Sequence, residues 1–102
     1  MPEKEFQIWI DSETVIRVTR ETVAGRLVRF AVVLIVRHEG HWLDIGRFDT
    51  AHGIPHQDVM GRRAGLLQKI WLDDLSPRQA FHHAIEIFKT DHERIKQHYF
   101  HN

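Results

Sequence analysis

The chain contains no cysteine, and this absence removes several classes of chemistry at once. Disulfide scaffolds, thiolate nucleophiles and cysteine zinc sites are all excluded. An excess of one charge is also missing, because 14 Lys and Arg are balanced by 14 Asp and Glu. A protein that neutralises nucleic-acid phosphates normally carries a basic excess or a basic face. Any role with nucleic acid therefore needs local clustering of cations, and general attraction to anionic membranes is not supported.

Long hydrophobic runs are absent as well. The longest apolar run covers residues 30–36, far short of the roughly 20 residues that a membrane span requires. The first residues, MPEKEFQIWID, show neither the basic segment nor the long apolar segment of a secretory signal. We therefore expect a soluble, cytoplasmic protein with no membrane partner.

The composition that remains is ordinary for a folded protein, apart from its histidines. The chain has 102 residues, of which 42% are hydrophobic and 27% are charged. These values fit a single globular domain spanning residues 1–102. Nine residues are histidine, so the net charge rises by several units as the pH falls through about 6.5.

Apolar alternation and β-branched residues predict four strands, over residues 6–10, 14–23, 26–38 and 41–50. The sequence RLVRFAVVLIVRH of residues 26–38 is the strongest of these signals, and its apolar centre favours the central strand of a sheet, covered on both faces. Glu39-Gly40 predicts a tight turn into an antiparallel return strand. Strict alternation along that return strand predicts opposite faces for Trp42 and Arg47.

The rest of the chain predicts a loop, one more strand and a helix. Gly53 and Pro55 break both periodicities, so residues 51–58 are expected to form a loop. Residues 60–71 are ambiguous between helix and strand, and their glycines favour a strand. Ser76 opens a Ser-x-x-Gln capping box, which predicts the start of an amphipathic helix of roughly 23 residues. The fold class is therefore α+β: a curved antiparallel sheet of about four to five strands packed against one long C-terminal α-helix.

The three tryptophans, Trp9, Trp42 and Trp71, are expected to anchor the hydrophobic core or its edge. The alternative is that they lie on the surface. If two of them are exposed on the sheet, a homodimer interface becomes the better interpretation.

Polar functional groups concentrate in residues 47–58, with the sequence RFDTAHGIPHQD. This segment begins at a strand end and continues through a proline-stiffened loop, a frequent position for functional sites. One interpretation is catalytic: His52 and His56 act as general base and general acid, and Arg47 stabilises an anionic transition state. Asp49 or Asp58 would orient one imidazole. Such a set suits cleavage of RNA, whose 2′-hydroxyl is an internal nucleophile.

The same segment has two other interpretations. Asp49, His52, His56 and Asp58 could bind a divalent metal such as zinc, manganese or iron. Their spacing is not a recognised tight metal signature, and the glycine and proline between them prevent the two histidines from sharing a helix face. In the third interpretation the cluster is structural: Arg47 pairs with an aspartate, and the histidines cap exposed backbone groups. All three stay open, and no cofactor beyond a divalent metal is expected.

The motif RFDTAHGxxHxD also carries a resemblance. It resembles a stretch of small uncharacterised bacterial and archaeal proteins, in which the motif follows a β-hairpin and a helix ends the chain. It is more distantly similar to TumE-like toxins of toxin–antitoxin pairs, which carry D-x-x-x-G-x-x-H-x-H after a strand. Asp49, Gly53 and His56 match the toxin pattern. Asp58 stands where that pattern prefers histidine, which leaves His52 as the second imidazole.

The strands and the helix follow in the same order as in these proteins over residues 28–99. This resemblance implies a toxin-like protein that acts on RNA and has a cognate antitoxin as partner. Two alternatives stand beside this function. The first is a non-catalytic module that binds a protein or forms a homodimer, and the second is a metal-binding domain at the same loop.

Overall fold

The structure, a computed structural model, describes residues 3–102, with the side chain of His52 left out. It contains strands, one short 3-10 helix and one α-helix. In chain order these are β1 (Glu3–Asp11), β2 (Thr14–Val23), β3 (Arg26–His38), β4 (His41–Asp49), η1 (Ala51–Gly53), β5 (His56–Gly61), β6 (Gly65–Trp71) and α1 (Pro77–His101).

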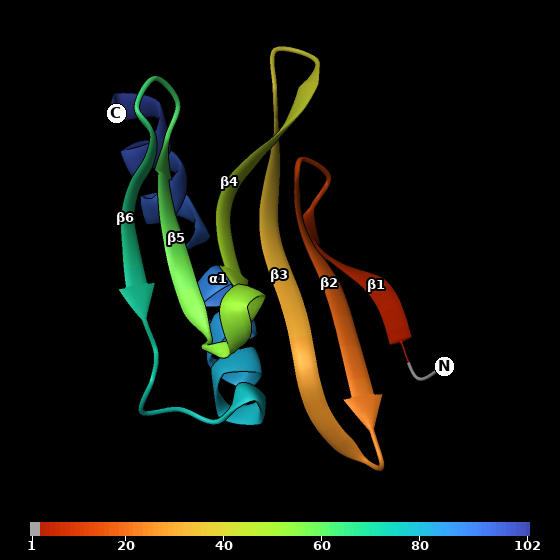
Figure 1. Ribbon diagram of the computed structural model, residues 1–102. Helices are drawn as coiled ribbons and strands as arrows, with labels where there is room; N and C mark the ends of the chain where they lie inside the picture. The colour runs from red at the N-terminus through yellow and green to blue at the C-terminus, as the bar shows by residue number, and fades with distance from the viewer. Residues whose placement is uncertain (1–2) are drawn as a thin grey trace.

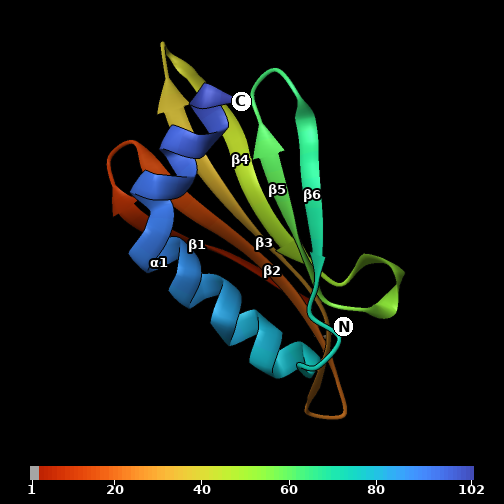
Figure 2. The ribbon, with the colours of Figure 1, turned by 90° about the vertical axis from the view of Figure 1, so that its left-hand side faces the viewer.

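All six strands form one antiparallel sheet in the order β1-β2-β3-β4-β5-β6 (Figure 1). The strands follow one another as a meander, so every connection within the sheet is a turn or a short loop. Helix α1 lies on one side of the sheet, and the connection between β4 and β5 projects on the other side (Figure 2). Among the described residues, no helix combines the length and the apolar character needed to cross a membrane. The expected α+β class, with its long C-terminal helix, is confirmed.

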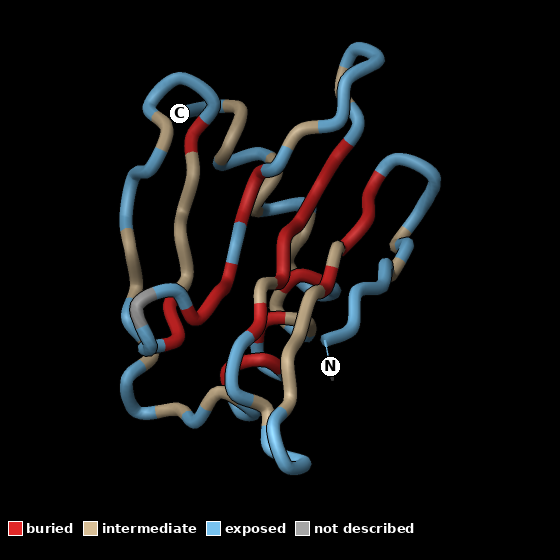
Figure 3. Tube along the Cα trace, turned by 45° about the vertical axis from the view of Figure 1, so that its right-hand side comes forward, coloured by how far each residue is buried: buried red, intermediate tan, exposed pale blue. Residues whose placement is uncertain are grey.

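The hydrophobic core lies between the sheet and α1. Every second residue of β3 from Phe30 to Val36 is buried in this core, and the apolar stripe of α1 packs against it through Ala84 and Phe88. Buried segments accordingly concentrate in the centre of the sheet (Figure 3). The helix begins where the sequence predicts, because the Ser76 side chain accepts from the Gln79 backbone N–H at 3.1 Å and completes the capping box.

The number of strands and the extent of the loop differ from the sequence-based expectation. We expected about four to five strands, a loop over residues 51–58 and a single strand over residues 60–71. The structure has six strands, because β5 already begins at His56 and a second turn separates it from β6. Gly53 and Pro55 interrupt the chain only briefly, and Gly65 adopts a positive φ of 74° that allows the second turn.

The strict alternation expected along β4 is also wrong, because the register shifts there. Leu34 pairs with Gly46, whereas Ile35 pairs with Asp44, so Ile45 is an extra residue in a β-bulge. The bulge turns Trp42 to the same side of the sheet as Arg47. A bulge leaves no signature in hydrophobic periodicity, which is why the sequence does not predict it.

We call the side of the sheet opposite α1 the helix-free face, because within residues 3–102 no α-helix covers it (Figure 2). It carries Trp9, Val15, Arg17, Val33, Ile35, Trp42, Asp44, Arg47, Asp49, His56, Asp58, Lys69 and Trp71. Val15, Val33 and Ile35 are buried there in a second small cluster, so both faces of β3 are covered, as its apolar sequence predicts. The tryptophans are not core residues: Trp9, Trp42 and Trp71 are 54%, 46% and 47% exposed. The expectation that they anchor the core is wrong, because α1 covers the other face of the sheet and, within residues 3–102, no second α-helix covers theirs (Figure 2).

Candidate functional site

The polar residues of the sequence motif lie in two parallel rows across β4, β5 and β6. In one row the register aligns Arg47 with Asp58, and Asp58 with Lys69. In the neighbouring row it aligns Asp49 with His56, and His56 with Trp71. Side chains two residues apart on a strand share a face, so both rows lie together on the helix-free face. The cluster is therefore built on paired strands and not on a loop.

His56 is the most enclosed member of the cluster, with 1% of its surface exposed. The Trp71 ring lies beside the imidazole, with the ring centroids 5.1 Å apart. His56 Nδ1 lies 3.0 Å from the backbone oxygen of Ile54. A carbonyl oxygen can only accept, so Nδ1 carries a hydrogen. This contact fixes the ring and directs Nε2 toward the aspartates.

Two carboxylates face that second nitrogen. Nε2 of His56 lies 3.0 Å from Asp49 Oδ1 and 3.8 Å from Asp58 Oδ1. One atom from each of the three residues lies within 4.8 Å of the other two. Both carboxylates are largely buried. Asp49 is held in place by the Ala51 backbone N–H, which donates to its Oδ1 at 2.9 Å at the start of η1.

Two cations flank the carboxylates from the side that is open to solvent. Lys69 Nζ donates to Asp58 Oδ1 at 2.9 Å, and Arg47 Nη1 lies 3.9 Å from Asp49 Oδ2. Lys69 also lies over the Trp71 ring, 5.6 Å from its centroid. Both cations are partly exposed, so they can contact a ligand that His56 cannot reach.

The structure brings together four of the five residues that the sequence nominates: Arg47, Asp49, His56 and Asp58. The side chain of the fifth, His52, lies outside the described residues, and only its backbone is placed, in η1. The sequence did not nominate Lys69 and Trp71 for this site. They belong to it through the β5–β6 register, which residue spacing cannot reveal.

The geometry bears differently on the three interpretations. The Arg47–Asp49 contact and the His56 bond to a backbone oxygen are contacts that the structural interpretation expects. Direct acid–base catalysis by His56 requires the imidazole to reach a substrate, and its burial hinders such contact; that role stays a prediction. Metal binding requires converging donor atoms, and an imidazole with two carboxylates is a donor set that zinc, manganese and iron accept.

Comparisons with known proteins place the chain in a family without giving it an activity. The chain matches, over residues 1–102, a family described as a domain of unknown function (DUF7718). No curated protein matches the chain significantly, and no solved structure does so. Since the match extends over every residue, the chain belongs to the DUF7718 family.

Proposed function

We propose that Asp49, His56 and Asp58 bind one divalent metal ion, and that this ion is central to the function of the domain. The observation that carries the proposal is the position of His56 Nε2, which faces two carboxylate oxygens at 3.0 and 3.8 Å while Nδ1 is committed to a backbone oxygen. The zinc, manganese and iron ions that the sequence suggests are the candidates.

The convergence of three ligand atoms supports this proposal. Nδ1 of His56 donates to the Ile54 carbonyl oxygen, so Nε2 is the ring nitrogen left to bind an ion. Nε2 lies 3.0 Å from Asp49 Oδ1 and 3.8 Å from Asp58 Oδ1. Lys69 and Arg47 flank the same two carboxylates, so a bound ion would share them with these side-chain cations.

The distances also fit a metal ion. Ligand atoms bonded at about 2.1 Å lie about 3.0 Å apart in octahedral coordination and about 3.4 Å apart in tetrahedral coordination. The Nε2 separation from Asp49 Oδ1, 3.0 Å, lies in this range, and that from Asp58 Oδ1, 3.8 Å, exceeds its upper end by about 0.4 Å. A small movement of the Asp58 side chain would therefore complete the site. Moreover, a metal-binding histidine usually donates its other N–H to a carbonyl or carboxylate oxygen, as Nδ1 of His56 does.

The first test compares metal binding by the wild type and by Asp58→Asn. Isothermal titration with Mn²⁺ and Zn²⁺ should give one ion per chain for the wild type. Asp58→Asn should weaken binding by at least about tenfold, because it removes a charged ligand but keeps the shape of the side chain. Saturating metal should also raise the melting temperature of the wild type, since only the folded state offers the assembled site.

Asp74→Asn is the matched control, because Asp74 is an exposed aspartate in the loop before α1. It should bind metal as the wild type does. If the wild type binds neither ion, or if both variants lose affinity equally, the cluster is a structural ion pair and the proposal is wrong.

For the substrate we propose RNA, the class that the toxin-like resemblance implies. Arg47 and Lys69 support this choice, because two partly exposed cations beside a metal ion favour a phosphodiester anion. A bound divalent ion would supply Lewis-acid activation of the phosphate or of a water molecule. Trp71 lies next to Lys69 and offers an exposed ring on which a base can stack.

Lys69→Met separates the substrate from the metal. With Mn²⁺ present, the variant should bind a fluorescein-labelled single-stranded RNA at least about tenfold more weakly than the wild type. Its Mn²⁺ affinity should not fall, because the lost ammonium repels the ion and competes for Asp58. Chelation by EDTA should abolish RNA binding by the wild type. RNA binding that EDTA and Lys69→Met both leave unchanged would refute the RNA proposal.

A second candidate function is homodimerisation through the Trp9–Trp42 pair. The two rings meet edge to face with centroids 5.8 Å apart, and each ring is about half exposed. Next to them, Arg17 and Asp44 form an ion pair at 3.8 Å. A two-fold axis through this patch would place the Arg17 of one copy against the Asp44 of the other, which gives a self-complementary interface.

Trp42→Ser tests this second function. Sedimentation velocity at several concentrations should show a wild-type dimer. The dissociation constant of the variant dimer should be at least about 30-fold higher than that of the wild type, since tryptophans at interface centres dominate affinity. Leu67→Ser, which removes an exposed apolar side chain elsewhere, should leave the dimer intact. A wild type that is monomeric at every concentration would contradict this function.

A further inference from the structure

Helix α1 is tied to the sheet at its end but stands away from β5 and β6 in its middle. At the helix end, the Arg62 backbone N–H donates to the Tyr99 carbonyl at 2.9 Å, and that of Ala64 donates to the Asn102 carbonyl at 3.0 Å. Earlier in the helix, a groove of about 300 Å³ opens between α1 and the strands β5 and β6. In Figure 2 this helix crosses the sheet diagonally, so it cannot cover all strands along its length.

The walls of the groove are mostly apolar. They are formed by Ile45, Val59, Ile70, Ile87, Phe88 and Ile95. Four of these six residues are partly exposed. A bound ligand would therefore remove apolar surface from water. Gly46 contributes to the floor, and a Cβ atom there would lie only 3.3 Å from the Phe88 ring.

One flank of the groove is polar and carries Arg94. The same stripe of α1 presents His83, Asp91 and His98 to the groove. Asp91 is already paired, because Arg94 Nη2 donates to its Oδ2 at 2.6 Å. A guanidinium has five N–H donors, so Arg94, which is largely exposed, keeps donors for a ligand. The second carboxylate of the lining, Asp58, is paired with Lys69 at 2.9 Å. The flank therefore offers a cation and two imidazoles, and both carboxylates of the groove already have a cationic partner.

We propose that this groove binds a small amphipathic carboxylate. The hydrocarbon part of the ligand lies on the apolar walls, and its carboxylate meets Arg94. A volume of about 300 Å³ is at the lower end of the range for small-molecule sites, so a medium-chain acid or an acid with one aromatic ring has the fitting size. The groove adjoins the proposed metal site, because Asp58 belongs to its lining, but its apolar walls lie on the other side of β5, where Gln57 and Val59 point.

The test uses three eight-carbon probes that differ only in their head group: octanoate, octan-1-ol and octylammonium. Octanoate should shift the backbone amide NMR signals of Val59, Ile70 and Ile87. It should leave the indole N–H signals of Trp9 and Trp42 in place, because both indoles lie on the helix-free face. Octylammonium should bind at least about tenfold more weakly than octanoate. Equal affinity for all three probes, or octanoate shifts confined to the tryptophans, would overturn the proposal.

Two variants locate the head group and the chain of the ligand. Arg94→Gln should lower octanoate affinity about tenfold, the effect of losing one charge-assisted hydrogen bond, and should leave octan-1-ol affinity unchanged. Arg78→Gln, at an exposed arginine in the first turn of α1, should change neither. Ile70→Phe should fill the groove and weaken all three probes while the NMR spectrum keeps its dispersion. Undiminished octanoate binding by Arg94→Gln and Ile70→Phe would show that the groove is not the site.

Discussion

Replacing His56 with glutamine is expected to weaken Mn²⁺ or Zn²⁺ binding by more than about 100-fold. Loss of an outer contact of a metal ligand alone costs about 10- to 100-fold, and His56 is proposed as a ligand itself. The glutamine amide can donate to Asp49, so the Asp49 carboxylate at the end of β4 still has a hydrogen-bond donor. Isothermal titration measures the affinity, and circular dichroism checks that the fold is kept.

A loss of folding would produce the same loss of binding, so the His56→Gln result needs a control in the same row. His56 packs beside the Trp71 ring, and Trp71→Phe keeps an aromatic cover but removes no proposed ligand. Trp71→Phe should bind metal within about threefold of the wild type. His56→Gln that folds and binds metal as tightly as the wild type would remove His56 from the site.

Replacing Phe88 with alanine is expected to lower the free energy of unfolding by about 3–5 kcal/mol, the usual cost of truncating a buried phenylalanine. Phe88 is fully buried in the core, its ring lies 5.1 Å from that of Phe48, and it also packs over Gly46. Alanine would leave a cavity beneath the middle of α1. Urea unfolding followed by circular dichroism measures this loss.

Phe6→Ala is the matched control for Phe88→Ala, because Phe6 lies on the edge strand β1 and is partly exposed. Its expected cost is below about 1 kcal/mol, as for most surface substitutions. Equal losses in the two variants would mean that α1 does not close the core as described.

The elements with strong local signals could be predicted from the sequence. The apolar run of residues 26–38 predicts a central strand, and β3 lies inside the sheet between β2 and β4. Glu39-Gly40 predicts a tight turn, and both residues have the positive φ angles that such a turn requires. Ser76 predicts the start of α1 through its capping box. In each case the deciding physics lies within a few neighbouring residues.

The features that depend on pairing between strands could not be predicted. Strand β5 begins with His56, in a polar stretch directly after Pro55, so no periodicity marks its start. The bulge at Ile45 places Trp42 on the face of the sheet opposite to the one that strict alternation predicts. Only the pairing of β3 with β4 reveals this bulge. The motif residues could be nominated as a group from the sequence. Their convergence, and the presence of Lys69 beside them, depend on the β4–β5–β6 register.

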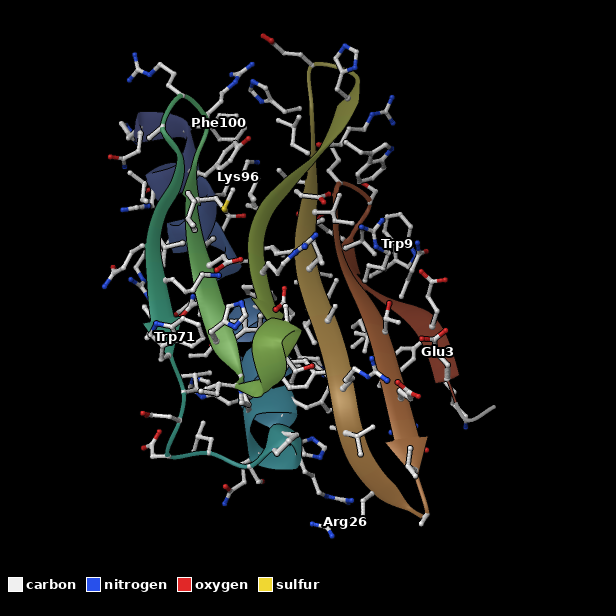
Figure 4. The ribbon with its side chains drawn as sticks, viewed as in Figure 1. Glu3, Trp9, Arg26, Trp71, Lys96 and Phe100 are labelled. Carbon is white, nitrogen blue, oxygen red and sulfur yellow. The ribbon has the colours of Figure 1, made fainter. Side chains whose placement is uncertain are left out.

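The two sides of the sheet divide the proposed functions. The helix-free face carries the proposed metal site on β4 and β5, and the exposed Trp9–Trp42 pair, which joins β1 to the first residues of β4. Figure 4 shows the wide separation of Trp9 and Trp71 across the sheet. The groove lies on the opposite side, beneath α1. Metal binding, self-association and ligand binding can therefore be tested with variants that do not share side chains.

Anomalous X-ray diffraction from crystals grown with Mn²⁺ locates a bound ion atom by atom. We predict one strong anomalous peak per chain, about 2.1 Å from Asp49 Oδ1, His56 Nε2 and Asp58 Oδ1. No peak at these atoms under saturating Mn²⁺, with His56 still bonded directly to Asp49, would contradict it.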